Sequence, residues 1–190
     1  MTIFVMTNII KCGVVIFLQV IIGCALADFV VAVFHWFEDN YLPVKKYRWR
    51  VIEELAKNNA VHHARPRDIL KYSVWINMCD PAIAGACIAL LIFLATGCAP
   101  TSIAFLVTTS MTQPIHQFQH MTRLERPFLA HVLFMTHLIV DPRTHHLHHS
   151  SKTTQYGIVF SHLNHLYETT GVWRHLEATV WPWWGPPVTK

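Results

Sequence analysis

Long apolar runs alternate with short polar segments along this chain. The first run extends from Cys12 to Phe34, about 23 residues, and is long enough as a helix to cross a bilayer core of ~30 Å. Asp28 interrupts it. The run is too long for a signal peptide and lacks a small-residue cleavage site. We therefore predict a first transmembrane helix.

The second and third apolar runs cover about residues 82–96 and 101–115. The segment between them, Gly97-Cys98-Ala99-Pro100, carries no charge. Glycine and proline indicate a tight turn, and the absence of Lys and Arg is typical of the non-cytoplasmic side. The pattern predicts a hairpin that crosses the membrane and returns.

The fourth run, residues 128–140, has only about 13 residues and is short for a membrane span. It predicts an interfacial or re-entrant helix. The polar connection of residues 38–71 is rich in Lys and Arg, and the positive-inside rule assigns it to the cytoplasmic side. The expected architecture is all-α: a single membrane domain over residues 1–190, with three transmembrane helices, an outside N-terminus and a histidine-rich cytoplasmic cap.

Composition agrees with a membrane protein. Hydrophobic residues make up 53% of the 190 residues and charged residues 14%, and the mean hydropathy is +0.32. The formal net charge of +4 is modest, and the basic residues do not alternate with aromatic ones, so nucleic acid is not an expected partner. None of the five cysteines forms a CxxC pair, so a thiolate metal site is not indicated.

The 14 histidines are the unusual feature. In the segment His145-His146-Leu147-His148-His149, the first, fourth and fifth residues would share one face of a helix. Those three imidazoles can therefore converge on one point, which is metal-ligand geometry. For this motif alone, a solvated polar loop is the alternative.

Three further motifs repeat the theme. His116 and His120 have i, i+4 spacing, as do His35 and Asp39. Adjacent His62 and His63 cannot share a helical face, but they can reach two different ions. The predicted topology places all four motifs on one side of the membrane. The expected metal ligands are eight histidines: His35, His62, His63, His116, His120, His145, His148 and His149.

Eight imidazoles exceed the ligand set of one tetrahedral zinc ion, so two ions are expected. The HExxH pattern of zinc hydrolases is absent, and imidazole suits iron. A dinuclear iron centre beside apolar helices would act on an acyl or alkyl chain. His131 and His137 are expected to be buried packing residues, and His146 to face solvent. Asn164 is a candidate contributor to the site, and Asp28 is either functional or paired structurally.

The ordered motifs resemble one family. His35-Trp36-Phe-Glu-Asp39-Asn40-Tyr41 is followed by His62-His63-Ala-Arg-Pro66, by the HxxxH and HHxHH blocks, and by Tyr156-Gly-Ile-Val with Leu163-Asn164. Over about residues 28–177 this set is similar to the lipid desaturases within the histidine-box desaturase and hydroxylase superfamily. The family includes plasmanylethanolamine desaturases and plastid phosphatidylglycerol fatty acid desaturases.

The resemblance implies a di-iron enzyme that uses O2 to remove two hydrogens from a lipid-bound fatty acyl or alkyl chain. It implies an external electron donor of the cytochrome b5 or ferredoxin type, the eight histidines as ligands, and Asp39 as a ligand or a hydrogen-bond acceptor beside them. Lys71-Tyr72-Ser73-Val74 replaces the Arg-His-Asp-Phe-like run of plasmanylethanolamine desaturases, which counts against a vinyl-ether product. A hydroxylase with the same ligands and a non-redox metal-binding membrane protein are the alternatives, and the oligomeric state stays open.

Overall fold

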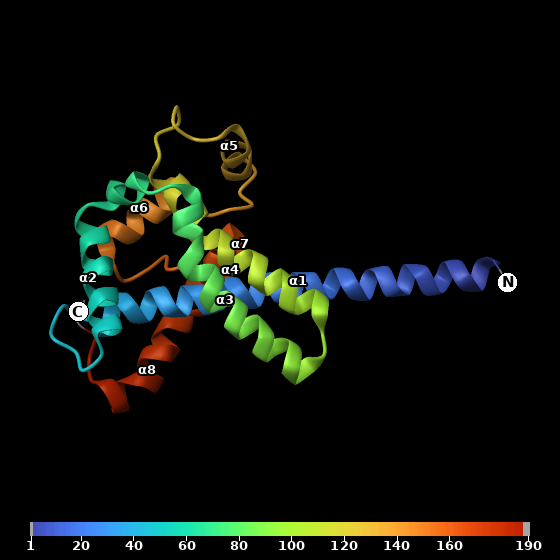
Figure 1. Cartoon of the computed structure of the whole chain (residues 1–190), viewed down its shortest axis with the longest axis horizontal. Helices are drawn as coiled ribbons and strands as arrows, with labels where there is room; N and C mark the ends of the chain where they lie inside the picture. The colour runs from blue at the N-terminus through green and yellow to red at the C-terminus, as the bar shows by residue number, and fades with distance from the viewer. Residues whose placement is uncertain (1, 188–190) are drawn as a thin grey trace.

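The computed structural model describes residues 2–187, with side chains from residue 8 onward. The described part is helical apart from turns, extended connections and one isolated bridge between Ile139 and Phe160. The elements, shown in Figure 1, are α1 (Thr2–Tyr41), α2 (Arg50–Ala64), the 3-10 helix η1 (Pro66–Lys71), α3 (Val74–Thr96), α4 (Ala99–His120), α5 (Phe128–Met135), α6 (Pro142–Ser151), α7 (Ser161–Thr170) and α8 (Val172–Trp184). The predicted all-α class is confirmed for these residues.

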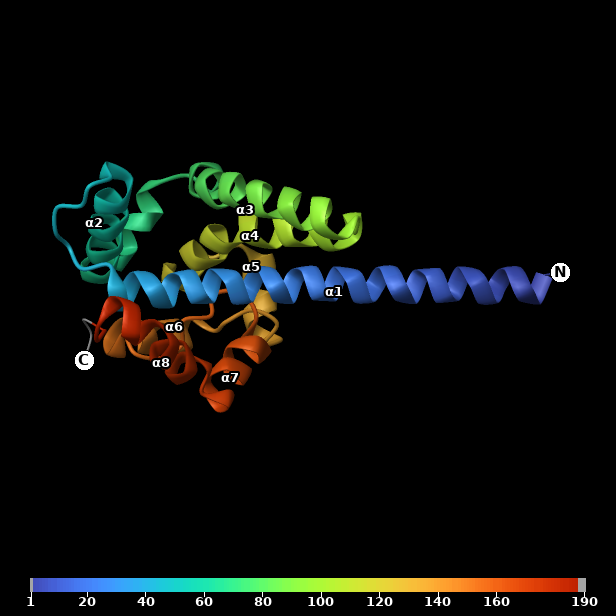
Figure 2. The same cartoon turned by 90° about the horizontal axis from the view of Figure 1, so that it is seen from below.

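Helix α1 is the axis of the molecule. Its 40 residues correspond to a length of about 60 Å. Figure 2 shows α3 and α4 on one side of α1 and α7 and α8 on the other, while the first half of α1 projects alone. In that half the apolar side chains of Ile16, Phe17 and Leu18 are exposed. Such a surface suits lipid, because no part of the described chain covers it.

Helices α3 and α4 form the predicted hairpin. Ser73 caps α3, its hydroxyl accepting a hydrogen bond from the Ile76 amide at 3.3 Å. Gly97, with φ +66°, ends the helix in the left-handed conformation that favours glycine. Pro100 then lies in the first turn of α4, where its missing N–H costs no helical hydrogen bond. The helix α3 begins at Val74, well before the apolar run that predicted it.

Helix α4 packs closely against both α1 and α3. A Cβ added to Gly23 would collide with the Thr101 carbonyl, and one added to Gly85 would collide with the Thr109 side chain. The Thr101 hydroxyl donates to the Gln19 carbonyl of α1 at 3.1 Å. Small residues therefore allow the close helix contacts that are typical of membrane bundles.

Two described helices are long and apolar enough to cross a membrane: α1, over Asn8–Tyr41, and α3. The third predicted span, α4, does not meet this criterion, because it carries buried Thr, Ser and Gln side chains. In α5, which covers only the first part of the fourth apolar run, Phe128 and Leu129 face outward. Its position relative to a membrane remains a prediction.

An extended segment of residues 152–160, here called the strap, joins α6 to α7 and is fixed to α1. Asp28 Oδ1 accepts hydrogen bonds from the amides of Val159 (3.1 Å) and Phe160 (3.2 Å), and its Oδ2 accepts one from the Tyr167 hydroxyl at 3.0 Å. A core cluster that includes Trp36, Tyr156 and Trp173 joins α1, the strap and α8. Asp28, which the sequence left as either functional or structurally paired, thus has structural partners.

Candidate metal centre

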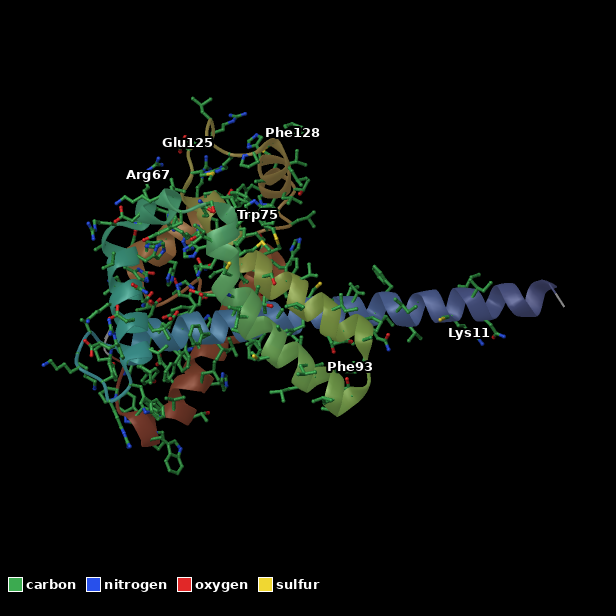
Figure 3. The ribbon with its side chains drawn as sticks, viewed as in Figure 1. Lys11, Arg67, Trp75, Phe93, Glu125 and Phe128 are labelled. Carbon is green, nitrogen blue, oxygen red and sulfur yellow. The ribbon has the colours of Figure 1, made fainter. Side chains whose placement is uncertain are left out.

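Eight histidines and one aspartate meet at the end of α1, between α2, α4 and α6. They form a five-histidine group, made of His62, His116, His120, His145 and His149, and a mixed group, made of His35, Asp39, His63 and His148. Within each group the possible ligand atoms lie within 4.8 Å of one another. Figure 3 shows nitrogen-bearing side chains filling the space enclosed by these helices.

In the five-histidine group, ring nitrogens from three elements converge. The Nε2 atom of His145 lies 3.0 Å from Nε2 of His120 and 3.0 Å from Nε2 of His149. The rings of His62 and His116 pack edge to face, with centroids 4.5 Å apart. Helix α2 supplies His62, α4 supplies His116 and His120, and α6 supplies the other two. A cation between the nitrogens would turn these contacts into coordination bonds.

The mixed group is built around the carboxylate of Asp39. Its Oδ1 accepts a hydrogen bond from Asn59 Nδ2 at 2.8 Å and lies 2.9 Å from His63 Nε2. Its Oδ2 lies 3.2 Å from His148 Nε2 and 3.7 Å from His35 Nε2. One carboxylate oxygen is therefore held by α2, while the other faces two further imidazoles.

Backbone carbonyls orient two rings of the mixed group. Nδ1 of His35 donates to the Tyr156 carbonyl at 3.1 Å, and Nδ1 of His148 donates to the Thr154 carbonyl at 2.9 Å. Because a carbonyl can only accept, the proton resides on Nδ1 and the lone pair on Nε2. Metal-binding histidines are commonly held in this way.

Buried polar atoms without hydrogen-bond partners indicate that the two groups fit metal ions. Among the described residues, several buried polar atoms of the two groups lack a hydrogen-bond partner, including Asp39 Oδ2, His148 Nε2, His62 Nε2 and both ring nitrogens of His116. Leaving such atoms unsatisfied is costly, and buried polar groups are normally paired. A cation in each group would satisfy these lone pairs.

Burial also keeps imidazoles of the five-histidine group neutral. Loss of water, followed by the positive charge that His120 would carry, lowers the pKa of His62 to about 3. Loss of water, followed by the charge of His62, lowers the pKa of His149 to about 2. Both rings are uncharged at neutral pH, the state in which imidazole binds a metal.

The structure brings together all nine candidate residues, the eight histidines and Asp39. It divides the His145–His149 motif between the two groups. His145 and His149 belong to the five-histidine group, whereas His148 belongs to the mixed group. The sequence allowed these three imidazoles to converge on one point, but His148 lies in the other group. On a helix, positions 148 and 149 are about 100° apart, so the two rings diverge. His62 and His63 separate into the two groups, as predicted for adjacent histidines.

Other candidates lie outside the two groups. Asn164 is buried but hydrogen-bonds to Gly157 and Gln155 of the strap. His146 is exposed, as predicted. His137 is exposed too, so the expectation that it packs inside is wrong; α5 ends at Met135 and His137 lies in the following turn with φ +55°.

Sequence reasoning missed Asn59, which holds Asp39 in place. The available signal was its position one helical turn before His63, which brings the side chains of both residues to the same face of α2. An amide one turn from a histidine is a weak pattern, because asparagines are common on exposed helices.

The fold and site define a class: an all-helical protein with two membrane-length helices and a histidine-rich site suited to metal ions. Comparison with known families is more specific. Residues 24–187 match the lipid desaturase domain, so the chain belongs to the lipid desaturase family and is an oxidoreductase. The resemblance seen in the sequence motifs is confirmed.

The name of one curated relative agrees with this assignment. The chain is 28% identical over 171 residues to a probable fatty acid desaturase of Acanthamoeba polyphaga mimivirus, an overlap of 86% of this chain and 82% of the relative. No solved structure matches the chain.

Proposed function

We propose that this protein is a di-iron, oxygen-dependent desaturase that introduces a double bond into a fatty acyl or alkyl chain carried by a membrane lipid. The observation that carries the proposal is the pair of adjoining ligand groups at the end of two apolar helices. The family match and the desaturase name of the viral relative support the same reaction.

Two irons match the donor set. The five-histidine group would hold one ion through neutral imidazoles, and the mixed group would hold the second through three imidazoles and Asp39. When bound, the iron pair would supply oxygen activation and the oxidising power to remove two hydrogens. The electrons would come from an external donor of the cytochrome b5 or ferredoxin type.

The chain's own residues prepare the site. Asn59 and His63 fix Asp39 Oδ1, so that Oδ2 faces the ligand space between His35 and His148. The Asp39 charge would partly offset that of the ions. Exposed apolar side chains of α1 and α3, such as Phe34 and Trp75, would lie against the acyl chains of the bilayer.

For the membrane arrangement we propose three crossings, by α1, α3 and α4, with the metal centre on the cytoplasmic side. Support comes from the hairpin and from the basic residues that surround the metal end. Exposed examples are Lys45, Lys46, Arg48, Arg65 and Lys71.

The proposal is tested by lipid mass spectrometry of a host with and without the chain. We expect a lipid species that has lost two hydrogen atoms, absent in a host that carries the His148→Ala variant. A product that has gained an oxygen atom would show a hydroxylase instead.

Metal analysis separates the remaining alternative. Purified protein should contain close to two irons per chain, and chelation should remove activity until Fe²⁺ is returned. Zinc, or a single ion, in purified protein that causes no change in the host lipids would contradict the di-iron proposal and favour a non-redox metal-binding protein.

A further inference from the structure

Alternate peptide units of the strap are hydrogen-bonded on both sides. In the Tyr156–Gly157 unit, the carbonyl accepts from His35 Nδ1 at 3.1 Å and the amide donates to Asn164 Oδ1 at 3.0 Å. In the Thr154–Gln155 unit, the carbonyl accepts from His148 Nδ1 at 2.9 Å and the amide donates to Glu168 Oε1 at 2.6 Å.

A third unit follows the same plan. The Ile158 carbonyl accepts from Gln119 Nε2 at 3.0 Å, and the Val159 amide donates to Asp28 Oδ1 at 3.1 Å. Gln119 immediately precedes His120 of the five-histidine group. Two of the three carbonyls thus contact histidines of the mixed group and the third contacts α4, while all three amides donate to α1 or α7.

The geometry of the peptide bond makes each pair of hydrogen bonds interdependent. A trans peptide is planar, so its C=O and N–H point in opposite directions. An acceptor that fixes the N–H therefore also fixes the direction of the C=O. Hydrogen bonds in such a chain polarise one another, so the acceptor also strengthens the carbonyl on which the imidazole depends.

Asn164 is built into this arrangement. Its side chain is 2% exposed, and its Nδ2 donates to Gln155 Oε1 at 2.7 Å. A Cβ at position 157 would lie 2.6 Å from Asn164 Oδ1, so glycine is required for the amide to approach. Glu168 is similarly fixed, because its Oε1 also accepts from Trp173 Nε1 at 2.8 Å.

We propose that Asn164 and Glu168 are positioning residues of the mixed group, which act through the strap on His35 and His148. Neither side chain belongs to a ligand group; each fixes a peptide unit whose carbonyl sets the tautomer and direction of one imidazole. Because both imidazoles belong to the mixed group, the two residues control the affinity of that metal position. The inference rests on the proposed occupation of both groups by metal.

The test is titration of the purified, metal-free chain with Co²⁺, followed by visible absorption and by competition with a chelator. The wild type should bind two ions. Asn164→Leu removes the hydrogen-bond acceptor with little change in side-chain size. It should lower the affinity for one of the two ions by about 10- to 100-fold, the usual cost of losing a residue that orients a metal ligand. Asn164→Asp keeps an acceptor oxygen and should restore binding.

A second pair of variants guards against misfolding at position 164. Glu168→Leu should lower the affinity for the same one of the two ions. Glu168→Gln, which still offers an oxygen acceptor, should keep that affinity close to the wild-type value. His165→Leu, at an exposed position of the same helix α7, is the matched control and should bind both ions as the wild type does. Nitrogen NMR of the His35 ring in the metal-free chain should show mixed tautomers in Asn164→Leu alone.

Two results would overturn the inference. Unchanged affinity for both ions in Asn164→Leu and Glu168→Leu would exclude a positioning role. Equal weakening of both ions, without rescue by Asp or Gln, would show a general structural role instead. If the wild type binds two ions and the Leu variants bind them equally well, only this inference is contradicted. If the wild type binds no ion, the metal centre itself is contradicted.

Discussion

Asn59 and Asp39 are joined by a hydrogen bond of 2.8 Å between Nδ2 and Oδ1, across the contact between α2 and α1. The same oxygen lies 2.9 Å from His63 Nε2. Asn59 and His63 are one turn apart on α2, so a single helix face holds one side of the carboxylate. Because this contact holds Oδ1, the other carboxylate oxygen, Oδ2, points toward His148.

Replacing Asn59 by Leu should therefore lower the metal affinity of the mixed group, although it removes no ligand. We expect metal affinity at that position to fall by about 10- to 100-fold, with a parallel loss of desaturation. Metal titration and product analysis measure both effects. The neighbouring Asn58, which is exposed, provides the control Asn58→Leu. If the two variants are indistinguishable, Asn59 does not hold Asp39.

His148→Ala should abolish activity while the chain stays in the membrane. The ring is fully buried in the mixed group, and losing a ligand should cost at least about a hundredfold, the upper limit for loss of an outer partner. His131→Ala should be far milder, because His131 lies on α5 outside both groups. Product analysis and iron content of membrane fractions compare the two. Equal loss would show that His131 has a role in the site.

Gly23→Val should separate α1 from α4. The added side chain would collide with the Thr101 carbonyl, and such overpacking costs about 1–3 kcal/mol. Thermal unfolding in detergent should show a lower midpoint. Gly13→Val is the matched control on the same helix, since a Cβ at Gly13 meets nothing within 4 Å. A similar midpoint for both variants would mean that the close contact is unimportant.

The loop after α4 should respond to pH through Glu125. Arg67, whose Nη2 lies 2.8 Å from Glu125 Oε1, is the main cause that lowers the pKa of this carboxyl from 4.5 to about 2. A carboxyl whose pKa is lower in the folded than in the unfolded state stabilises the fold at pH values above its unfolded-state pKa. For Glu125 this contribution is lost as the pH falls from about 4.5 to about 2.

Carboxyl-carbon NMR measures this pKa directly. Arg67→Gln should raise it toward 4.5, whereas Arg123→Gln, a change at an exposed neighbour, should leave it low. The effect on overall stability is small because the pair is exposed. A pKa that stays low in Arg67→Gln would assign the shift to the Thr122 amide, which donates to Glu125 Oε2 at 2.7 Å.

Local periodicity explains what could be predicted from sequence. Spacing of four residues predicted that His116 and His120 share one group, and adjacency predicted that His62 and His63 reach different ones. Glycine and proline at positions 97 and 100 predicted the hairpin. Each of these inferences involves residues close in the chain, where helix geometry alone fixes the relation.

The rest depends on how helices are rotated against one another. His145 and His148 enter different groups because of the way α6 faces α1 and α4, and no local spacing contains that information. The contact of Asp28 with Val159 joins residues far apart in the chain. The apolar run also did not reveal that α4 buries many of its Thr, Ser and Gln side chains.

Each ligand group is assembled from three separate helices. The five-histidine group takes its nitrogens from α2, α4 and α6, and the mixed group takes its donors from α1, α2 and α6. Such sites do not exist in the unfolded chain, so the free energy of binding iron would add to that of folding. If the two groups hold iron as proposed, a cell short of iron should contain less of this protein, because the metal-free chain would be less stable and more accessible to proteases.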